Sequence, residues 1–532
     1  MPAKAKKRRK KAASKQTATA NHSIWIDFAI AAATGGLLGL SAPGFDQWYL
    51  VWIGLVPLLL FASSSTNPWQ AFLRGLVFGW AYNLVYLNWY LSLYPLNWLG
   101  FNNWQGILLA TAAWLIVSAH QAIIIGIFTA LYRLLPLSGG FLPRQVEERW
   151  HLPALVTVPL LWVVVVNKLG NAHDALGVPW SMLEYSQYQI LPLIQAASCI
   201  GGIGIGTLIV AVNVAVAGLI ATVSKRLAWS ALAAPTAEAS ARQALTVVLS
   251  VAVIYAAGFT SLTSTQQHPS CNLAVVQGNI NIDMQKTEHR YTLSELFAQY
   301  TSMMDLCHPG LCIWTESALP SYLRNQNGTI ANLAALAIQK KTDIVVGAMD
   351  RDDSDHPFNS AYGMSRAGRL LPDVYHKRYL VPFGEYTPWL VQYLPAWLQK
   401  LTNTPSGGGF AAGAAAVVLP LPCGKVAPLI CFETLSPELV CSSVRAGGSL
   451  LVNISDLAWF HDSMIGRQML AFSVLRAVEN RRYFVFAANS GPSAIVDPQG
   501  CIRAASAAGS QKLLAGKVGF ATDLSPFTLW YR

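Results

Sequence analysis

Charged side chains are scarce in this chain of 532 residues. Asp, Glu, Lys and Arg make up 12% of it, against about 25% in a typical soluble domain. The shortage is uneven: charges are sparse from Ile24 to Leu262 and reach ordinary density from Asn272 onward. Together with 53% hydrophobic residues, this distribution argues against a wholly soluble protein. We expect a membrane domain followed by a globular domain.

Zinc-binding cysteine patterns are also missing. The spacings of the eight cysteines match no zinc site, and nothing in the sequence implies a metal, a nucleotide or another cofactor. The cysteines are Cys199, Cys271, Cys307, Cys312, Cys423, Cys431, Cys441 and Cys501. Cys307 and Cys312 could pair if their domain lies in an oxidising compartment, which the sequence leaves open.

Acidic residues are absent from the N-terminal tail, residues 1–22, which carries eight lysines and arginines and contributes much of the net charge of +11. Such a run can bind nucleic acid, but we interpret it as a disordered cytoplasmic tail that is attracted to anionic lipid headgroups, with no nucleic-acid partner. A cleaved signal peptide is not expected, because several further apolar segments follow the first one.

Seven apolar segments approach the length of about 20 residues that a membrane crossing needs. They lie near 24–41, 47–63, 70–94, 105–132, 153–167, 188–223 and 243–263. The fifth is short, and the sixth is long enough to be kinked or broken around Gly201–Gly206. We therefore predict a membrane domain of about seven helices over residues 23–264.

The basic residues of the loops indicate the orientation. With the tail in the cytoplasm, the inside loops and their edges carry Arg74, Arg133, Arg144, Arg149, Lys225, Arg226 and Arg242, whereas the outside loops carry only Lys168. This bias follows the positive-inside rule. Seven crossings then predict that everything after about residue 264 is extracytoplasmic.

The second half alternates short apolar runs with helical runs. The runs typical of strands are 273–276, 311–314, 343–348, 361–365, 426–431, 450–455, 483–489 and 494–496, and those typical of helices are 292–305, 330–340, 437–445 and 465–482. This alternation predicts a layered α/β domain, over residues 265–518. A short segment, 519–532, follows it without an evident eighth membrane helix.

Three predicted strand ends carry chemically useful side chains: Glu316, Lys377 and Cys431. A carboxylate can take a proton, an ammonium can stabilise an oxyanion, and a thiolate is a nucleophile. We expect Cys431 to lie at a strand-to-helix turn, with the helix beginning within Glu433–Glu438, so that the helix dipole favours the thiolate. Without such partners, a single cysteine is more often a buried structural residue.

The motifs that hold these residues resemble those of the apolipoprotein N-acyltransferases, a membrane-anchored family of the nitrilase, or carbon-nitrogen hydrolase, superfamily. The similar stretches include Trp314–Pro320, His376–Glu385, Cys431–Glu433, Val276–Ile280 and Leu475–Arg482, and the resemblance covers roughly residues 24 to 530. It implies a multi-pass helical membrane domain joined to an αββα nitrilase-like domain on the periplasmic side of the bacterial inner membrane.

The resemblance also implies residue roles: Cys431 as nucleophile, Glu316 as general base and Lys377 as oxyanion stabiliser. Glu385 and Glu433 match further acidic positions, where they either orient the lysine or act directly. The implied substrates are a phospholipid acyl donor and a diacylglyceryl-modified apolipoprotein, whose N-terminal amine is acylated through a thioester intermediate.

The chain departs from the family pattern in four places. Phe432 stands where a tyrosine is usual, and Ser455–Phe460 differs from the usual Ser-Asn-Asp-Ala-Trp-Phe. The tryptophan expected shortly after Val276–Ile280 is absent near Met284–Lys286, and the chain stops at Arg532, before the family's last membrane helix. These departures concern substrate preference and anchoring more than the chemistry.

Three residues are candidate lipid contacts. Lys168 follows an apolar segment on the outer side, where it either snorkels or binds a lipid phosphate. Trp389 lies in an aromatic, apolar stretch before the glycine run Gly407–Gly409, which suits either a mobile lid or an ordinary packed helix and loop. Trp459 belongs to a stretch that resembles the family.

Two other functions stay open. One is a membrane-tethered amidase or nitrilase that uses water as the acceptor. The other is a non-catalytic membrane scaffold or transporter, which the intact set of Glu316, Lys377 and Cys431 disfavours.

Overall fold

The computed structural model describes residues 24–138, 144–146, 149–170, 179–223, 237–263, 269–281, 291–382, 384–387, 393 and 409–531. The described residues form two compact units. The first draws on Met1–Asn88, Ala112–Ser186 and Gly206–Ala252, and the second on Trp89–Thr111, Gln187–Ile205 and Val253–Arg532. The second unit thus includes segments that we expected in the membrane domain, and the domain limit at residue 264 stays a prediction.

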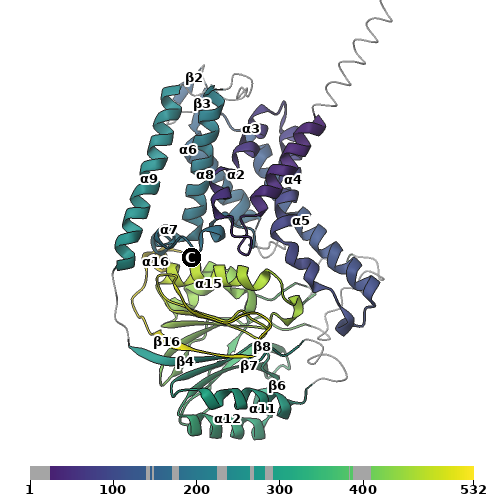
Figure 1. Ribbon diagram of the computed structural model, residues 1–532, viewed down its shortest axis with the longest axis vertical. Coiled ribbons are helices and arrows are strands. Elements are labelled where there is room, and N and C mark those ends of the chain that lie inside the picture. Colours follow the sequence, from purple (N-terminus) through teal and green to yellow (C-terminus); the bar gives the residue numbers. More distant parts are fainter. Residues whose placement is uncertain are drawn as a thin grey trace, which may run out of the picture. The chain divides into compact units, whose positions relative to one another are not determined.

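Helices account for every expected apolar segment (Figure 1). They are Ile24–Gly39, η1 (Trp48–Leu50), α2 (Val51–Gly54), α3 (Val56–Ser64), α4 (Pro68–Tyr86), η2 (Asn88–Leu93), η3 (Asn97–Leu99), α5 (Asn103–Leu134), α6 (Ala154–Trp162), η4 (Val163–Leu169), η6 (Leu183–Gln187), α7 (Leu191–Ile194), α8 (Ala197–Val223) and α9 (Ala237–Thr263). The short strands β1 (Leu137–Ser138), β2 (Arg144–Val146) and β3 (Arg149–Pro153) pair with one another.

Three helices of the described chain are long and apolar enough to cross a membrane: Asn103–Leu134, Ala197–Thr222 and Ala237–Thr263. The apolar helices Ile24–Gly39, Trp48–Ser64 and Ala154–Leu169 are shorter. The membrane character of this half is therefore confirmed, whereas the number of crossings and the orientation stay predictions.

The predicted break in the sixth apolar segment is confirmed. Gly201, inside α8, has φ 70° and ψ 170°, a conformation that only glycine adopts readily. A Cβ at this position would lie 2.3 Å from the ring of Phe527, so the close approach of this ring also requires glycine.

The second unit contains two β-sheets. From one edge to the other, the larger sheet runs β16 (Lys512–Gly519), β4 (Ser270–Gln277), β5 (Leu311–Trp314), β7 (Asp343–Arg351), β8 (Pro357–Met364) and β9 (Tyr375–His376), with β6 (Leu319–Tyr322) on β7. The smaller runs β10 (Leu419–Leu421), β11 (Gly424–Ile430), β12 (Leu450–Ser455), β13 (Phe484–Ala488), β14 (Ala494–Val496) and β15 (Ile502–Ala505).

The helices of this unit cover the sheets. They are α11 (Leu293–Met303), η8 (Met304–Leu306), η9 (Leu323–Asn325), α12 (Asn327–Lys340), η11 (Cys431–Leu435), α14 (Pro437–Arg445), η12 (Ala458–Phe460), α15 (Ile465–Asn480) and α16 (Pro526–Trp530). Helices α11 and α12 lie outside the larger sheet, and α15 lies outside the smaller one (Figure 1). The four layers form the αββα arrangement that the resemblance implied.

Alternation along the strands produces two cores. In β4, Leu273 and Val275 point into the core between the sheets, whereas Ala274 and Val276 point toward α11 and α12. Successive side chains of a strand face opposite sides, so a strand buried on both faces reads as a continuous apolar run. This explains why β5, β12 and β14 match their predicted ranges.

Cys307 and Cys312 are free thiols, and a disulfide between them stays a hypothesis.

Candidate active site

Glu316 follows strand β5 and is buried, with 7% of its surface exposed. The backbone N–H of Asp456 donates to its Oε2 at 2.7 Å, and Asn359 Nδ2 donates to its Oε1 at 2.7 Å. Burial raises the pKa of this carboxyl, and the charges of Glu385 and Asp456 raise it further, against the lowering effect of Lys377. A carboxyl with a raised pKa is suited to proton transfer near neutral pH.

Lys377 comes directly after strand β9 and is 1% exposed. Its Nζ donates to Glu385 Oε1 at 2.8 Å and lies 3.4 Å from Glu316 Oε1. Burial alone would lower the pKa of this amine, but the two carboxylates outweigh burial and hold the pKa above its ordinary value. The side chain is therefore a buried ammonium with two anionic partners.

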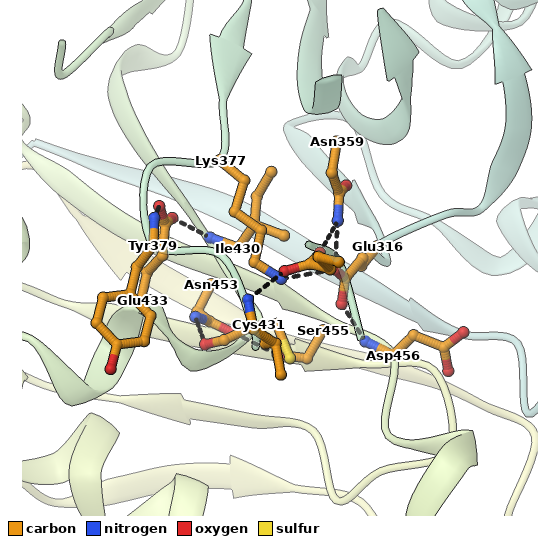
Figure 2. Close-up of polar contacts among 12 residues, drawn as sticks. Glu316, Asn359, Lys377, Tyr379, Ile430, Cys431, Glu433, Asn453, Ser455 and Asp456 are labelled. Atoms are coloured by element: carbon orange, nitrogen blue, oxygen red, sulfur yellow. Dashed lines mark hydrogen bonds and ion pairs between the residues drawn. The ribbon is translucent and has the colours of Figure 1, made fainter. Parts of the chain in front are cut away.

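Cys431 stands at the end of strand β11, with φ 53° and 6% exposure. The charges of Glu316 and Lys377 act on its thiol, and Figure 2 shows the three side chains in one cluster. The convergence that the sequence could only assume is thus present in the structure.

A short turn, η11, covers Cys431–Leu435 directly at the nucleophile. The helix α14 begins at Pro437, within the stretch Glu433–Glu438 where the sequence predicted a helix start. Burial, followed by the charge of Glu316, raises the pKa of the Cys431 thiol, while Lys377 lowers it less. The resting form is the thiol, because no α-helix begins at Cys431 to favour the thiolate and the nearby carboxylates oppose a second negative charge. A base must therefore remove the proton when the substrate is bound.

Asn453, on strand β12, fixes the turn that carries the cysteine. Its Nδ2 donates to the carbonyl oxygen of Cys431 at 2.8 Å and to Thr434 Oγ1 at 2.7 Å, and its Oδ1 accepts a hydrogen bond from Ser455 at 2.6 Å. Sequence reasoning missed Asn453 and Asn359. The available signal was an asparagine inside an apolar strand, which is costly to bury unless it is hydrogen-bonded.

Glu433 connects the turn that carries Cys431 with the segment that follows Lys377 (Figure 2). Its Oε1 accepts from the backbone N–H of Arg378 at 2.6 Å, and its Oε2 accepts from that of Ile430 at 2.7 Å and from Tyr375 Oη at 2.6 Å. Of the two roles left open for Glu433, these contacts favour orientation. Glu385 also orients: it holds Lys377 Nζ, and its Oε2 accepts from the backbone N–H of Val381 at 2.9 Å.

The stretch Ser455–Phe460, which departs from the family pattern, is connected by hydrogen bonds to the motif Val276–Ile280. Asp456 Oδ1 accepts from the backbone N–H of Ala458 at 3.1 Å and from Asn489 Nδ2 at 3.0 Å. Asn489 in turn exchanges two hydrogen bonds with the backbone of Ile280. The backbone N–H of Asp456 holds Glu316, so this network fixes the Glu316 carboxyl.

A series of aromatic rings in contact with one another begins at the turn that carries Cys431. The ring of Phe432 stacks on Phe460 with centroids 6.2 Å apart, and Phe460 meets the edge of Trp89 at 5.2 Å. Trp459 lies edge-on to Trp98 at 4.5 Å. We name Phe432, Phe460 and Trp89 the aromatic row; it starts at the residue next to the nucleophile.

Lys168 and Trp389 are the remaining lipid candidates. Lys168 belongs to the first unit, where it is exposed in the last turn of η4. Trp389 lies outside the described residues. Their roles stay predictions.

Metal ligands do not gather anywhere in the described part of the chain, where no group of three His, Cys, Asp or Glu side chains could hold an ion. The site thus brings together a thiol, a carboxyl and a fixed ammonium, a set that suits acyl transfer through a covalent intermediate.

Comparison with known proteins assigns the family. The family model for the apolipoprotein N-acyltransferase N-terminal domain matches residues 34–215, and that for carbon-nitrogen hydrolases matches 272–522. The apolipoprotein N-acyltransferase of Geobacter metallireducens is 33% identical over 500 residues, which cover 92% of this chain and 89% of that protein. The chain belongs to the apolipoprotein N-acyltransferase family.

Other members of the family are similarly related. The apolipoprotein N-acyltransferase of Gloeobacter violaceus is 31% identical over 477 residues, 88% of this chain and 84% of that protein. Among solved structures, Saccharomyces cerevisiae Nit3, a nitrilase-superfamily member, matches 48% of this chain and 93% of its own at 17% identity, with a TM-score of 0.35.

Proposed function

We propose that this protein transfers an acyl group from a phospholipid to the N-terminal amine of a diacylglyceryl-modified apolipoprotein, with Cys431 as the acyl carrier. Family membership makes the chain an acyltransferase of lipoprotein biosynthesis. The observation that supports the mechanism best is the buried cluster in which Glu316 and Lys377 both act on the thiol of Cys431.

The first half-reaction forms a thioester. The Glu316 carboxylate takes the thiol proton while the sulfur attacks the ester carbonyl of the phospholipid, and a carbon–sulfur bond forms. The Lys377 ammonium stabilises the resulting oxyanion. The ester carbon–oxygen bond then breaks, and the leaving oxygen takes the proton from Glu316, which releases a lysophospholipid.

The second half-reaction consumes the thioester. The neutral α-amino group of the lipoprotein attacks the thioester carbonyl, and Glu316 accepts a proton from the nitrogen. The carbon–sulfur bond breaks, the amide remains on the lipoprotein, and the proton returns to Cys431. Glu316 serves both half-reactions in this proposal, because burial raises its pKa and a carboxyl with a raised pKa can take a proton and return it within the site.

Two features support lipid substrates. The aromatic row begins beside the nucleophile, so an acyl chain attached to Cys431 has apolar rings next to it. The chain also has a membrane-embedded half, which keeps a lipid-anchored donor and acceptor near the site. The bias of loop charges places the catalytic half on the extracytoplasmic face in this proposal.

Mass spectrometry of the protein after incubation with phospholipid vesicles tests the carrier role. We expect an acyl adduct on Cys431 in the wild type and none in Cys431→Ala. Cys441→Ala is the matched control, because Cys441 is equally buried in the same unit but carries no proposed chemistry. Equal acylation of Cys431→Ala and wild type would overturn the mechanism.

A second assay separates transfer from hydrolysis, since the match to carbon-nitrogen hydrolases leaves water as a conceivable acceptor. The acylated enzyme is given a diacylglyceryl-cysteine peptide. Formation of the N-acylated peptide supports transferase activity, whereas release of free fatty acid without that product indicates a hydrolase.

A further inference from the structure

Arg378 follows Lys377 directly in the sequence, and its guanidinium forms hydrogen bonds with helix α14. Nη1 donates to Ser442 Oγ at 2.9 Å. Nη2 donates to the carbonyl oxygen of Leu439 at 3.1 Å and to Ser443 Oγ at 3.0 Å. One side chain thus connects the residue beside the ammonium with one face of this helix.

Helix α14 is joined closely to the nucleophile. The turn Cys431–Leu435 leads through Ser436 into α14, which begins at Pro437, and Ser436 caps the new helix by accepting the backbone N–H of Leu439. The helix also packs against this turn and against strand β11, which ends just before Cys431. A side chain that is fixed to α14 is therefore fixed relative to Cys431.

Lys377, in contrast, is held by the larger sheet. Its backbone N–H donates to the carbonyl oxygen of Asn359, on β8, at 2.9 Å, and its own carbonyl oxygen accepts from the backbone N–H of Gly413 at 2.8 Å. Strands β8 and β9 belong to the larger sheet, whereas β11 belongs to the smaller one. Contacts that cross between the two sheets therefore set the separation of the ammonium from Cys431.

Two such contacts involve Arg378. Its backbone N–H donates to Glu433 Oε1 at 2.6 Å, and its guanidinium reaches α14. Tyr375 connects the two contacts, because its hydroxyl accepts from Arg378 Nε at 3.3 Å and donates to Glu433 Oε2 at 2.6 Å. A guanidinium is planar and its N–H groups point in fixed directions, so partners bound along several of them are held in one geometry.

The acceptors of the guanidinium favour a geometric role over an ion pair. The four that the described residues provide are two serine hydroxyls, one tyrosine hydroxyl and one backbone carbonyl, and all four are neutral. An arginine that served mainly to balance a buried carboxylate would donate to that carboxylate.

We propose that Arg378 is a positioning residue, whose side chain holds the Lys377 ammonium at a fixed distance from Cys431 by connecting its segment to α14. The inference rests on the proposed function, in which this ammonium stabilises the oxyanion formed when Cys431 attacks. Arg378 touches neither the substrate nor the sulfur in this role, so it acts only through Lys377.

Steady-state kinetics of the full-length protein with phospholipid vesicles gives the first test. Arg378→Met removes the hydrogen bonds, and we expect kcat to fall about tenfold while KM stays within about twofold of wild type. Arg445→Met is the matched control, because Arg445 belongs to α14 and donates instead to the carbonyl oxygens of Thr528 and Tyr531. An equal fall in both variants would overturn the proposal.

Two further variants separate geometry from charge and from folding. Arg378→Lys keeps the charge but lacks the fork, so its kcat should be close to that of Arg378→Met, and a kcat equal to wild type would overturn the proposal. Ser442→Ala combined with Ser443→Ala removes two acceptors and leaves Arg378 in place, which keeps the test available if Arg378→Met does not fold. We expect about a threefold fall in kcat for this pair, and an unchanged kcat counts against the proposal.

Alkylation of Cys431 by iodoacetamide, followed by mass spectrometry at several pH values, reports the ammonium without any substrate. Glu316, Glu385 and Asp456 raise the pKa of this thiol through their charges, and Lys377 lowers it. If the ammonium moves away in Arg378→Met, the thiol pKa rises and the rate profile should move by about half a pH unit to higher pH. A profile equal to that of wild type would contradict the positioning role.

The two measurements fail independently. A shifted alkylation profile in Arg378→Met, together with no acyl adduct on Cys431 in the wild type, refutes the proposed function and leaves the positioning of the ammonium standing. An acyl adduct in the wild type, together with an unmoved profile in Arg378→Met, refutes the positioning role alone.

Discussion

The second unit contains two buried ion pairs of similar composition and different character. Glu316 and Lys377 meet beside Cys431, whereas Arg476 Nη1 and Glu479 Oε2 meet at 2.9 Å within α15. Burial raises the pKa of the glutamate in both pairs. A raised glutamate pKa therefore does not identify the active site by itself.

The partners of each glutamate make the difference. Glu479 faces one arginine and accepts the backbone N–H of Gly202 at 2.8 Å, so its charge is balanced by groups that do not react. Glu316 shares one lysine with Glu385 and lies close enough to the Cys431 thiol to influence it. Two carboxyl groups, Glu316 and Glu385, thus share one ammonium beside the thiol, which leaves one of them able to exchange a proton. This excess of carboxyl groups distinguishes the pair proposed to react from the pair of Arg476 and Glu479.

The largest expected effect on the rate of acyl transfer is that of replacing the proposed base, Glu316. Glu316→Gln keeps the shape but cannot take a proton, and it retains only one of the two oxygens that accept hydrogen bonds, so the rate of acyl transfer should fall about a thousandfold. Single-turnover formation of the Cys431 adduct measures it. Glu479→Gln is the matched control, and a similar loss of activity there would remove the distinction between the two pairs.

The second largest effect is expected for replacing the ammonium of Lys377. Lys377→Met removes the charge that stabilises the oxyanion, and kcat should fall about a hundredfold with little change in KM. Steady-state kinetics with vesicle-bound donor measures the two constants. If KM rose and kcat held, Lys377 would be a binding residue.

Arg476 should affect stability instead of chemistry. Arg476→Met leaves Glu479 buried without its cation and should cost about 3 kcal/mol of stability. Thermal unfolding followed by tryptophan fluorescence measures the loss. Below the unfolding midpoint, acyl transfer should stay within about threefold of wild type, and a larger drop would connect the structural pair to the reaction.

A smaller, directional effect is expected for Asp456→Asn. Glu316 works as a base when ionised, so activity is lost as pH falls through its pKa, which lies above the ordinary value of 4.5. Removing the Asp456 charge lowers that pKa and should move the acid limb of the kcat/KM profile to lower pH. If the acid limb of the kcat/KM profile does not move, the charge of Asp456 does not influence the pKa of Glu316, and Asp456 acts only through its backbone N–H.

The smallest effect is expected for Phe432→Tyr, which restores the side chain usual in the family. The stack on Phe460 is kept and a hydroxyl is added, so kcat/KM should change by no more than about threefold. Kinetics with donors of different chain length would reveal a tenfold change, which would mean that the phenylalanine is adapted to this chain's own substrate.

The sequence predicted elements that are buried on both faces and missed those that are short or half-exposed. β5 and β12 read as apolar runs because all their side chains are buried, whereas β15 and β16 carry exposed residues and lack that signal. The helix predicted to begin within Glu433–Glu438 begins at Pro437, but the sequence did not show that the Glu433 side chain accepts backbone N–H groups from two segments.

The site was predictable for similar reasons. Glu316, Lys377 and Cys431 stand in motifs long enough to recognise, so their meeting could be hypothesised from the chain alone. Asn359 and Asn453 act through side-chain hydrogen bonds to residues that are distant in the sequence, and such partners depend on strand pairing that no local pattern encodes.

Glu433 has a consequence for how this enzyme can be altered. Since one carboxylate binds backbone amides of both Arg378 and Ile430, the separation of nucleophile and ammonium is set locally, whatever sequence connects those two residues. The part of the connecting segment that follows Glu385 can then differ between relatives while the nucleophile and the ammonium keep their separation.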